Sequence, residues 1–134
     1  MNDKAFFDTN IVLYAFRQDD SRSQAAEKLI AGGGTISVQV LNEFVAVARR
    51  KLNRRWQEIR RTLAILRLFC PEPVPLTMQV HEGALVIAER YGYSIFDSLV
   101  IAAAVQSGSR ILYSEDMRDG QKIDGLTIRN PFRL

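Results

Sequence analysis

Short apolar segments with the character of β-strands alternate along this chain with longer segments that show helical periodicity. This alternation favours an α/β fold, and we expect a three-layer sandwich with a central, mostly parallel sheet. In such a sheet, functional groups gather beyond the carboxyl ends of the strands. The strands are expected at residues 4–7, 35–38, 76–78, 110–114 and 126–129, and the helices at residues 11–16, 23–31, 39–52, 55–69, 79–91 and 95–106.

Length and composition narrow the class of protein. The 134 residues predict a single domain, 1–134. The hydrophobic content of 47% excludes general disorder, and no apolar run reaches the roughly 18 residues that span a bilayer. Residues 1–4 lack the basic start of a signal peptide, and Cys70 is the only cysteine, which excludes an internal disulfide. We therefore expect a cytoplasmic protein with no role at a membrane.

Two aspartates stand directly at or just beyond the ends of expected strands. Asp8 follows the apolar segment that ends at Phe7, and Asp116 follows the segment that ends at Ser114. Strand ends are the expected place for functional groups in a parallel sheet. The alternatives are that Asp8 caps the next helix and that Asp116 belongs to an acidic surface turn.

A glutamate and a third aspartate lie in helical segments. Glu43 shares its helix face with residues three or four positions away, and buried carboxylates need a partner. The alternative for Glu43 is an exposed position at the rim of the helix. Asp97 opens the most apolar helix, where Ser94 to Asp97 also fits the pattern of a capping box. The neighbours on the face of Glu43 are Gln39, Val40, Ala46 and Val47.

The four acids Asp8, Glu43, Asp97 and Asp116 could meet at one edge of the sheet. Such a cluster would repel itself, because like charges disfavour ionisation. Mg²⁺ or Mn²⁺ would resolve the conflict, since hard divalent cations prefer oxygen ligands, and a metal-bound water can attack a phosphodiester. His81 is the only histidine and is expected to be structural or solvent-facing, which disfavours a zinc site.

Five motifs of the chain resemble those of PIN-domain nucleases, and they occur in the family's order. They are FDTNIVLYA at residues 7–15, NEF at 42–44, FDSLVIAAA at 96–104, YSEDM at 113–117 and GLTIRNPF at 125–132. Together they span nearly the whole chain. Within that family, a compact single-domain chain is most similar to the VapC-type toxins of prokaryotic toxin–antitoxin pairs.

The resemblance implies a PIN-like fold and an endoribonuclease that depends on Mg²⁺ or Mn²⁺. It further implies that RNA is the substrate, that the products are a 5′-phosphate and a 3′-hydroxyl, and that a homodimer is held inactive by a cognate antitoxin. The residues that match the acidic quartet, as catalytic residues and metal ligands, are Asp8, Glu43, Asp97 and Asp116. The residues that match supporting positions are Thr9 and Asn10 in the first acidic loop, Ser114 near the metal, and Asp119, an acid that the family carries less regularly.

Basic residues concentrate in one stretch, residues 49–67, which carries eight positive charges and the single acid Glu58. The chain's net charge is +3, so the remainder is net acidic. The stretch either attracts phosphates at the rim of the site or forms a solvated helical face. Trp56 either stacks on an unpaired base or packs between helices. The candidate RNA contacts are Arg49, Arg50, Lys51, Arg54 and Arg55.

Three other functions remain to be compared. A phosphatase of the haloacid-dehalogenase type normally carries a second acid where this chain has Asn10, and it needs a late lysine, for which Lys122 is the sole candidate and follows no expected strand. A receiver domain would require an acidic pair at the first strand end, where only one acid stands. A catalytically inactive PIN-like binding module is the non-enzymatic alternative, and retention of all four acids argues against it.

Overall fold

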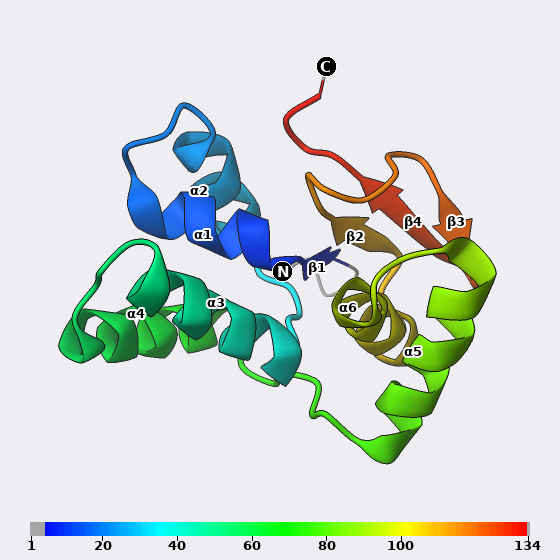
Figure 1. The fold of residues 1–134 in the computed structure, drawn as a ribbon. Coiled ribbons are helices and arrows are strands. Elements are labelled where there is room, and N and C mark those ends of the chain that lie inside the picture. The colour runs from blue at the N-terminus through cyan, green and yellow to red at the C-terminus, as the bar shows by residue number, and fades with distance from the viewer. Residues whose placement is uncertain (1–4, 134) are drawn as a thin grey trace.

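The computed structural model describes residues 5–133, which form six helices around a four-stranded sheet (Figure 1). Lys4, expected to begin the first strand, lies outside the described residues, as do residues 1–3 and 134. The elements are, in chain order, β1 (Ala5–Phe7), α1 (Thr9–Arg17), α2 (Ser23–Ala31), α3 (Val38–Arg50), α4 (Trp56–Phe69), α5 (Met78–Tyr91), α6 (Ile95–Gln106), β2 (Ile111–Tyr113), β3 (Lys122–Ile123) and β4 (Leu126–Arg129).

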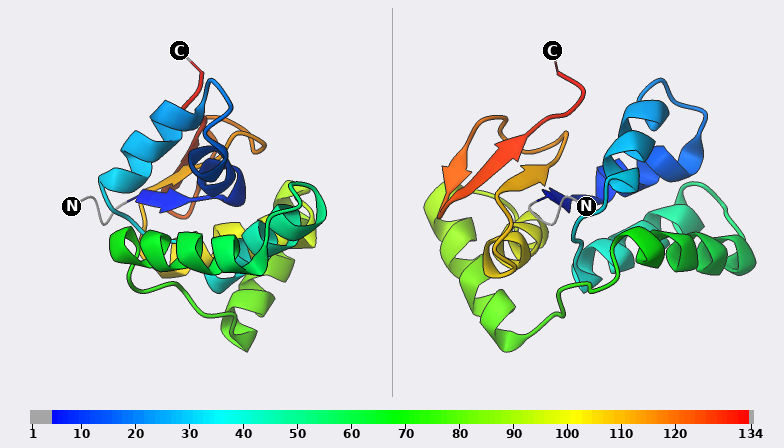
Figure 2. Two further views of the ribbon diagram at one scale, coloured as in Figure 1. Left: turned by 90° about the vertical axis from the view of Figure 1, so that its left-hand side faces the viewer. Right: turned by 180° about the vertical axis from the view of Figure 1, so that it is seen from behind.

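The sheet is mostly parallel, as the alternation of strands and helices predicted. Its strand order is β1-β2-β4-β3, and β2 pairs in parallel with both β1 and β4. Only β3 runs antiparallel, to β4. Helices lie on both sides of the sheet, with α2 on one side of β1 and α4 on the other (Figure 2). The three-layer α/β arrangement expected from the sequence is confirmed.

Two of the expected strands do not form. Residues 35–38 contribute only two isolated parallel bridges, from Thr35 to Phe6 and from Ser37 to Val74, because Ser37 already caps α3 by accepting from the amide of Val40 at 3.2 Å. The strand expected at residues 76–78 is also wrong. Thr77 caps α5 there, accepting from the Val80 amide at 3.1 Å, and the neighbouring bridge joins Val74 to Ser37. Both segments carry a hydroxyl cap, which starts a helix and ends the extended backbone.

A short antiparallel strand, β3, was not expected. It pairs with β4 through a turn in which Asp124 has φ 49° and Gly125 has φ 84°. An Asp-Gly pair with positive φ at both positions is typical of a tight hairpin. That dipeptide was therefore a readable signal for β3 in the sequence.

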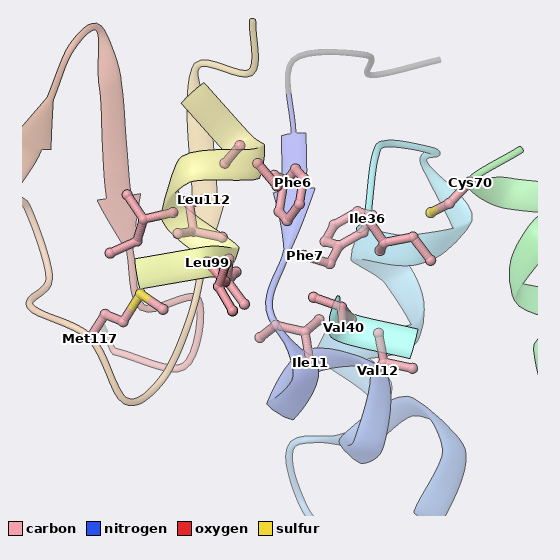
Figure 3. Packing of buried hydrophobic residues seen from close by; sticks show 14 of the residues in the cluster. Phe6, Phe7, Ile11, Val12, Ile36, Val40, Cys70, Leu99, Leu112 and Met117 are labelled. Carbon is pink, nitrogen blue, oxygen red and sulfur yellow. The ribbon is translucent and has the colours of Figure 1, made fainter. Parts of the chain in front are cut away.

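The core surrounds β1 and α6 (Figure 3). Phe6 and Phe7 point to opposite faces of β1, yet both are fully buried, so both faces of this strand are covered. The segment from Ser98 to Ala104 in α6 is buried without interruption, which accounts for its nearly apolar sequence. Helix α5 packs against α6 through small residues: a Cβ atom on Gly83 would lie 3.6 Å from the Cβ of Ala102.

Among residues 5–133, no helix is long and apolar enough to cross a membrane. The expectation that His81 faces solvent agrees with its exposed position on α5. The register of β1 and β2 is the feature of the fold that matters most for function. It pairs Phe7 with Tyr113, so that the segments after β1 and β2 leave the same edge of the sheet side by side.

Candidate functional site

The parallel register brings Asp8 beside Ser114. The amide of Asp8 donates to the carbonyl of Tyr113 at 3.0 Å, which extends the ladder by one step. The carboxylate of Asp8 then accepts from two donors at 2.7 Å each, the Ser114 hydroxyl at Oδ2 and the Thr9 amide at Oδ1. Asp8 therefore caps α1, as one of the two interpretations from the sequence predicted, and it also lies in a polar site at the end of β1.

Asp8 is only 4% exposed, and this burial dominates its protonation. Burial raises the pKa of Asp8 from 3.8 to about 7, against the lowering effect of the hydrogen bonds from Ser114 and Thr9. The negative charges of Asp97 and Glu43 raise the pKa of Asp8 further. A carboxyl group in this position is costly to ionise and favours a nearby positive charge.

Glu43 is held by two neutral donors. The Thr9 hydroxyl donates to Oε1 at 2.7 Å, and the Gln39 amide donates to Oε2 at 2.8 Å. Gln39 lies one helical turn earlier on α3 and is buried, so the two side chains share a face. The two polar side chains of Thr9 and Gln39 therefore provide the partners that a buried Glu43 needs, without a basic residue.

Asp97 lies in the first turn of α6 but is not the residue that caps it. Ser94 caps the helix by accepting from the Asp97 amide at 3.1 Å. Burial raises the pKa of Asp97, followed by the charges of Glu43 and Asp116, while the Ser94 hydroxyl lowers it. These effects show that the Asp97 carboxylate lies within electrostatic reach of two other acids.

Asp116 lies in the loop after β2, and its carboxylate is fixed from α1. The side-chain amide of Asn10 donates to Oδ2 of Asp116 at 3.0 Å. The carbonyl oxygen of the same Asn10 side chain accepts from the backbone amide of Glu115 at 3.3 Å. Asn10 therefore connects the loop backbone with the acid that the loop carries.

All four acids line one open pocket of about 660 Å³. The carboxylates come from the end of β1, from α3, from the first turn of α6 and from the loop after β2. Three polar side chains that donate hydrogen bonds to the acids, one further amide side chain, three apolar residues, one basic residue and one aromatic residue complete the lining. They are Thr9, Asn10, Gln39, Asn42, Leu13, Ala46, Val47, Arg50 and Phe96.

The donor set fits a hard divalent cation. Every candidate ligand is a carboxylate, and the burial of Asp8 beside two further acids leaves negative charge without a positive partner. Within residues 5–133, no group of three or more such side chains already stands at ligand spacing, and the carboxylates of Asp8, Glu43 and Asp116 each accept from a hydrogen-bond donor. A small cation that keeps several of its waters would need only some of these acids as direct ligands.

Asp119 and most of the basic stretch lie apart from the pocket. Asp119 accepts from the Asn130 amide at 2.9 Å and contacts Arg133. Arg49 donates to the Arg54 carbonyl at 3.0 Å and covers the ring of Trp56 at 4.9 Å. The other expected RNA contacts lie around the α3–α4 junction, with Arg54 over the ring of Phe16, Arg55 at the cap of α4 and Lys51 exposed at the end of α3. Of the five expected RNA contacts, Arg50 alone lines the pocket.

Sequence reasoning missed several members of the site. Gln39 was recognised only as a neighbour of Glu43 on the helix face, although the spacing of four residues was a usable signal for their hydrogen bond. Phe96, which is 60% exposed, lies directly before Asp97 and lines the same pocket. No local pattern marked Tyr14 and Arg22, whose contacts with Glu115 arise between distant segments.

Comparisons with known proteins place the chain in a fold family. A family model for the PIN domain matches residues 5–124, whereas no curated protein matches the chain. A toxin–antitoxin complex from Klebsiella pneumoniae contains a similar structure, with a TM-score of 0.72 and 20% identity over 97% of this chain and 99% of that chain.

Two further solved structures share the arrangement of helices and strands. VapC20 from Mycobacterium tuberculosis, described as a sarcin–ricin loop cleaving toxin, has a TM-score of 0.69 and 23% identity over 84% of this chain and 89% of that chain. VapBC2 from Rickettsia felis, bound to a DNA fragment from its promoter, has a TM-score of 0.65 and 19% identity over 94% and 97% of the two chains. At these identities the likeness concerns the fold.

Proposed function

The chain belongs to the PIN domain family, and on this basis we propose that it is an endoribonuclease that hydrolyses RNA with the help of Mg²⁺ or Mn²⁺. The observation that carries the proposal is the convergence of Asp8, Glu43, Asp97 and Asp116 from four separate segments on one pocket. A structural role for the four acids would not require them to face one another, because their mutual repulsion has an electrostatic cost.

Asp8, Asp97, Asp116 and Glu43 are the residues that would hold the metal. A bound divalent cation supplies an activated water and neutralises charge on the scissile phosphate. The described structure offers no competing soft site in the pocket, since His81 is exposed on α5 and Cys70 is buried elsewhere in the core. The donor set therefore supports Mg²⁺ or Mn²⁺ over zinc.

The chain's own residues would divide the work between positioning and substrate binding. Ser114 and the Thr9 amide orient the carboxylate of Asp8, and Thr9 and Gln39 orient that of Glu43. Arg50 lies on the pocket wall, where its guanidinium would bind a phosphate next to the cleaved one. Phe96 exposes its ring at the same pocket and would stack on an unpaired base.

Cleavage of a labelled single-stranded RNA tests the proposal directly. We expect cleavage with Mg²⁺ or Mn²⁺, no cleavage in excess chelator, and loss of cleavage on Asp8→Asn. Asp124→Asn is the matched control, because Asp124 lies in the β3–β4 turn outside the pocket and Asn also tolerates its positive φ. Cleavage that persists in chelator, or equally in Asp8→Asn, would overturn the metal mechanism.

The same assay separates the alternatives. An inactive binding module would bind RNA without cutting it at any metal concentration. A phosphatase of the haloacid-dehalogenase type would release phosphate from a small phosphate ester. The structure offers that phosphatase no support, since Lys122 lies on β3 and no lysine of the described residues lines the pocket.

We further propose that the chain is the toxin of a toxin–antitoxin pair and forms a homodimer. The toxin–antitoxin assemblies among the similar structures support this proposal. The chain also exposes apolar side chains that a partner would cover, including Ile65 and Phe69 beside a groove of about 480 Å³ between α1, α2 and α4. Light scattering of the purified protein, alone and coexpressed with a candidate antitoxin, tests both assemblies; a monomer under both conditions would contradict them.

A further inference from the structure

Two acids that are adjacent in the sequence, Glu115 and Asp116, have different surroundings. Asp116 lines the carboxylate pocket, whereas Glu115 does not. Both oxygens of Glu115 are instead engaged by Tyr14 of α1 and by Arg22, which directly precedes α2. The Tyr14 hydroxyl donates to Oε1, and the Arg22 guanidinium donates from Nη1 to Oε2 at 2.6 Å.

The groups that bind Glu115 are themselves fixed. Arg22 donates from Nε and Nη2 to the two carboxylate oxygens of Asp20, at 2.9 and 3.1 Å, in a bidentate pair. Its guanidinium lies 4.4 Å from the centre of the Tyr14 ring, and this ring meets Phe132 edge-on at 5.3 Å. We call the arrangement of Tyr14, Arg22 and Glu115 the Glu115 clamp.

The loop that carries Asp116 is attached at both of its ends. The Ser114 amide donates to the Arg129 carbonyl at 3.0 Å, and the buried Met117 donates from its amide to the Ser114 hydroxyl at 3.3 Å. Between them, the Glu115 amide donates to Asn10, and the Asn10 side chain donates to Asp116. The orientation of the exposed Asp116 therefore depends on Asn10 directly and on where the clamp holds the neighbouring Glu115.

We propose that Arg22 and Tyr14 are positioning residues, which hold Glu115 out of the carboxylate pocket and thereby present Asp116 to it. The inference rests on the proposed function, because it assigns Asp116 to the metal-binding side of the loop. It adds that selection between the two neighbouring acids is made by α1 and the start of α2. Without the clamp, Glu115 would lose both of its side-chain donors, and the Asn10 side chain alone would hold Asp116 at the pocket.

The first test uses nuclear magnetic resonance on the metal-free protein. Tyr14→Phe removes only the hydroxyl and keeps the ring that contacts Phe132 and Arg22. We expect the side-chain amide signals of Asn10 to move and the Glu115 amide to exchange faster, in Tyr14→Phe and in Arg22→Ala. Arg17→Ala is the control, because Arg17 pairs only with the exposed Asp19 in the same α1–α2 region. Unchanged Asn10 and Glu115 signals in both clamp variants would overturn the proposal.

The second test measures binding of Mn²⁺ alone by titration calorimetry, with no RNA present. Loss of a residue that orients a metal ligand typically weakens affinity by roughly 10-fold or more, and we expect about 10-fold here for Arg22→Ala with no change for Arg17→Ala. Arg22→Lys keeps the charge and should recover part of the affinity. Wild-type affinity in both Arg22→Ala and Tyr14→Phe would show that the clamp does not position Asp116 for a metal.

The two tests also separate failure of this inference from failure of the proposed function. If the wild-type protein bound no Mn²⁺, or bound it equally after Asp8→Asn, the metal site itself would be wrong. The resonance experiment would still decide whether the clamp governs the loop, since it involves neither metal nor RNA. A comparison of thermal midpoints for all variants identifies any loss of Mn²⁺ binding that comes from partial unfolding.

Discussion

Replacement of Asp8 by Asn should stabilise the metal-free protein, and more so as the pH rises. Burial raises the pKa of Asp8 from 3.8 to about 7, so the folded protein holds a proton that the unfolded chain releases. The contribution of Asp8 to the free energy of unfolding is fully present below about pH 4 and is lost as the pH rises toward 7. Asn is neutral at every pH, and its oxygen can still accept from the Thr9 amide.

The size of the effect follows from the width of that pH window. Each pH unit between the two pKa values corresponds to about 1.4 kcal/mol. Between pH 5 and pH 7 the wild type should therefore lose roughly 3 kcal/mol of unfolding free energy through Asp8, with little further loss above pH 7. The Ser114 hydroxyl loses its carboxylate acceptor in the variant, which offsets the gain by about 1 kcal/mol at the pH values where wild-type Asp8 is ionised.

Urea unfolding in excess chelator at pH 5, 6, 7 and 8 measures the effect. The quantity of interest is the difference in unfolding free energy between Asp8→Asn and wild type at each pH, because contributions from other groups common to both proteins largely cancel. Asp124→Asn provides the baseline for an exposed aspartate. We expect the difference for Asp8→Asn to grow by roughly 3 kcal/mol from pH 5 to pH 8 and that for Asp124→Asn to stay flat.

A pH-independent difference would refute the reasoning, because it would mean that Asp8 ionises as readily in the folded protein as in the unfolded chain. A difference that shrinks with pH would give the opposite sign and would indicate a positive partner for Asp8. Saturating Mn²⁺ should reverse the ranking of the two proteins, since a ligand that binds only the folded wild type stabilises it by mass action. Equal stabilisation of both proteins would place the ion elsewhere.

Three further predictions concern other residues of the pocket. Asp97→Asn should abolish RNA cleavage yet leave the thermal midpoint within a few degrees of wild type, because Ser94 remains as the cap; normal cleavage would make Asp97 purely structural. Asp116→Asn should melt at or above the wild-type temperature without metal. It should also gain less stability than the wild type when Mn²⁺ is added, where the wild-type gain is about 2.7 kcal/mol at an Mn²⁺ concentration roughly 100 times the dissociation constant. An equal metal-induced shift in melting temperature would remove Asp116 from the site. Phe96→Ala should weaken binding of single-stranded RNA in chelator by about 1–3 kcal/mol and Phe96→Tyr should retain it, as measured by fluorescence anisotropy; equal affinities would exclude stacking.

The sequence by itself determined the helices and the positions of the acids along the chain. All six helices of the described residues lie within two residues of the expected ranges, since helical periodicity and capping residues are local signals. Short strands were harder to recognise, because a stretch such as residues 76–78 has the composition of a strand while Thr77 caps a helix. An extended segment becomes a strand only when a neighbour pairs with it.

Only the tertiary structure decided which polar groups meet. The register of β1 against β2 sets Asp8 beside Ser114, although 106 positions separate them. The packing of α1 against α3 gives Glu43 its donor Thr9. Asp119 falls outside the pocket although it lies three residues from Asp116. Periodicity carries information over about four residues, whereas the pairing of strands and the packing of helices join segments a hundred residues apart. The acids could therefore be named from the sequence, but their donors and the clamp on Glu115 could not.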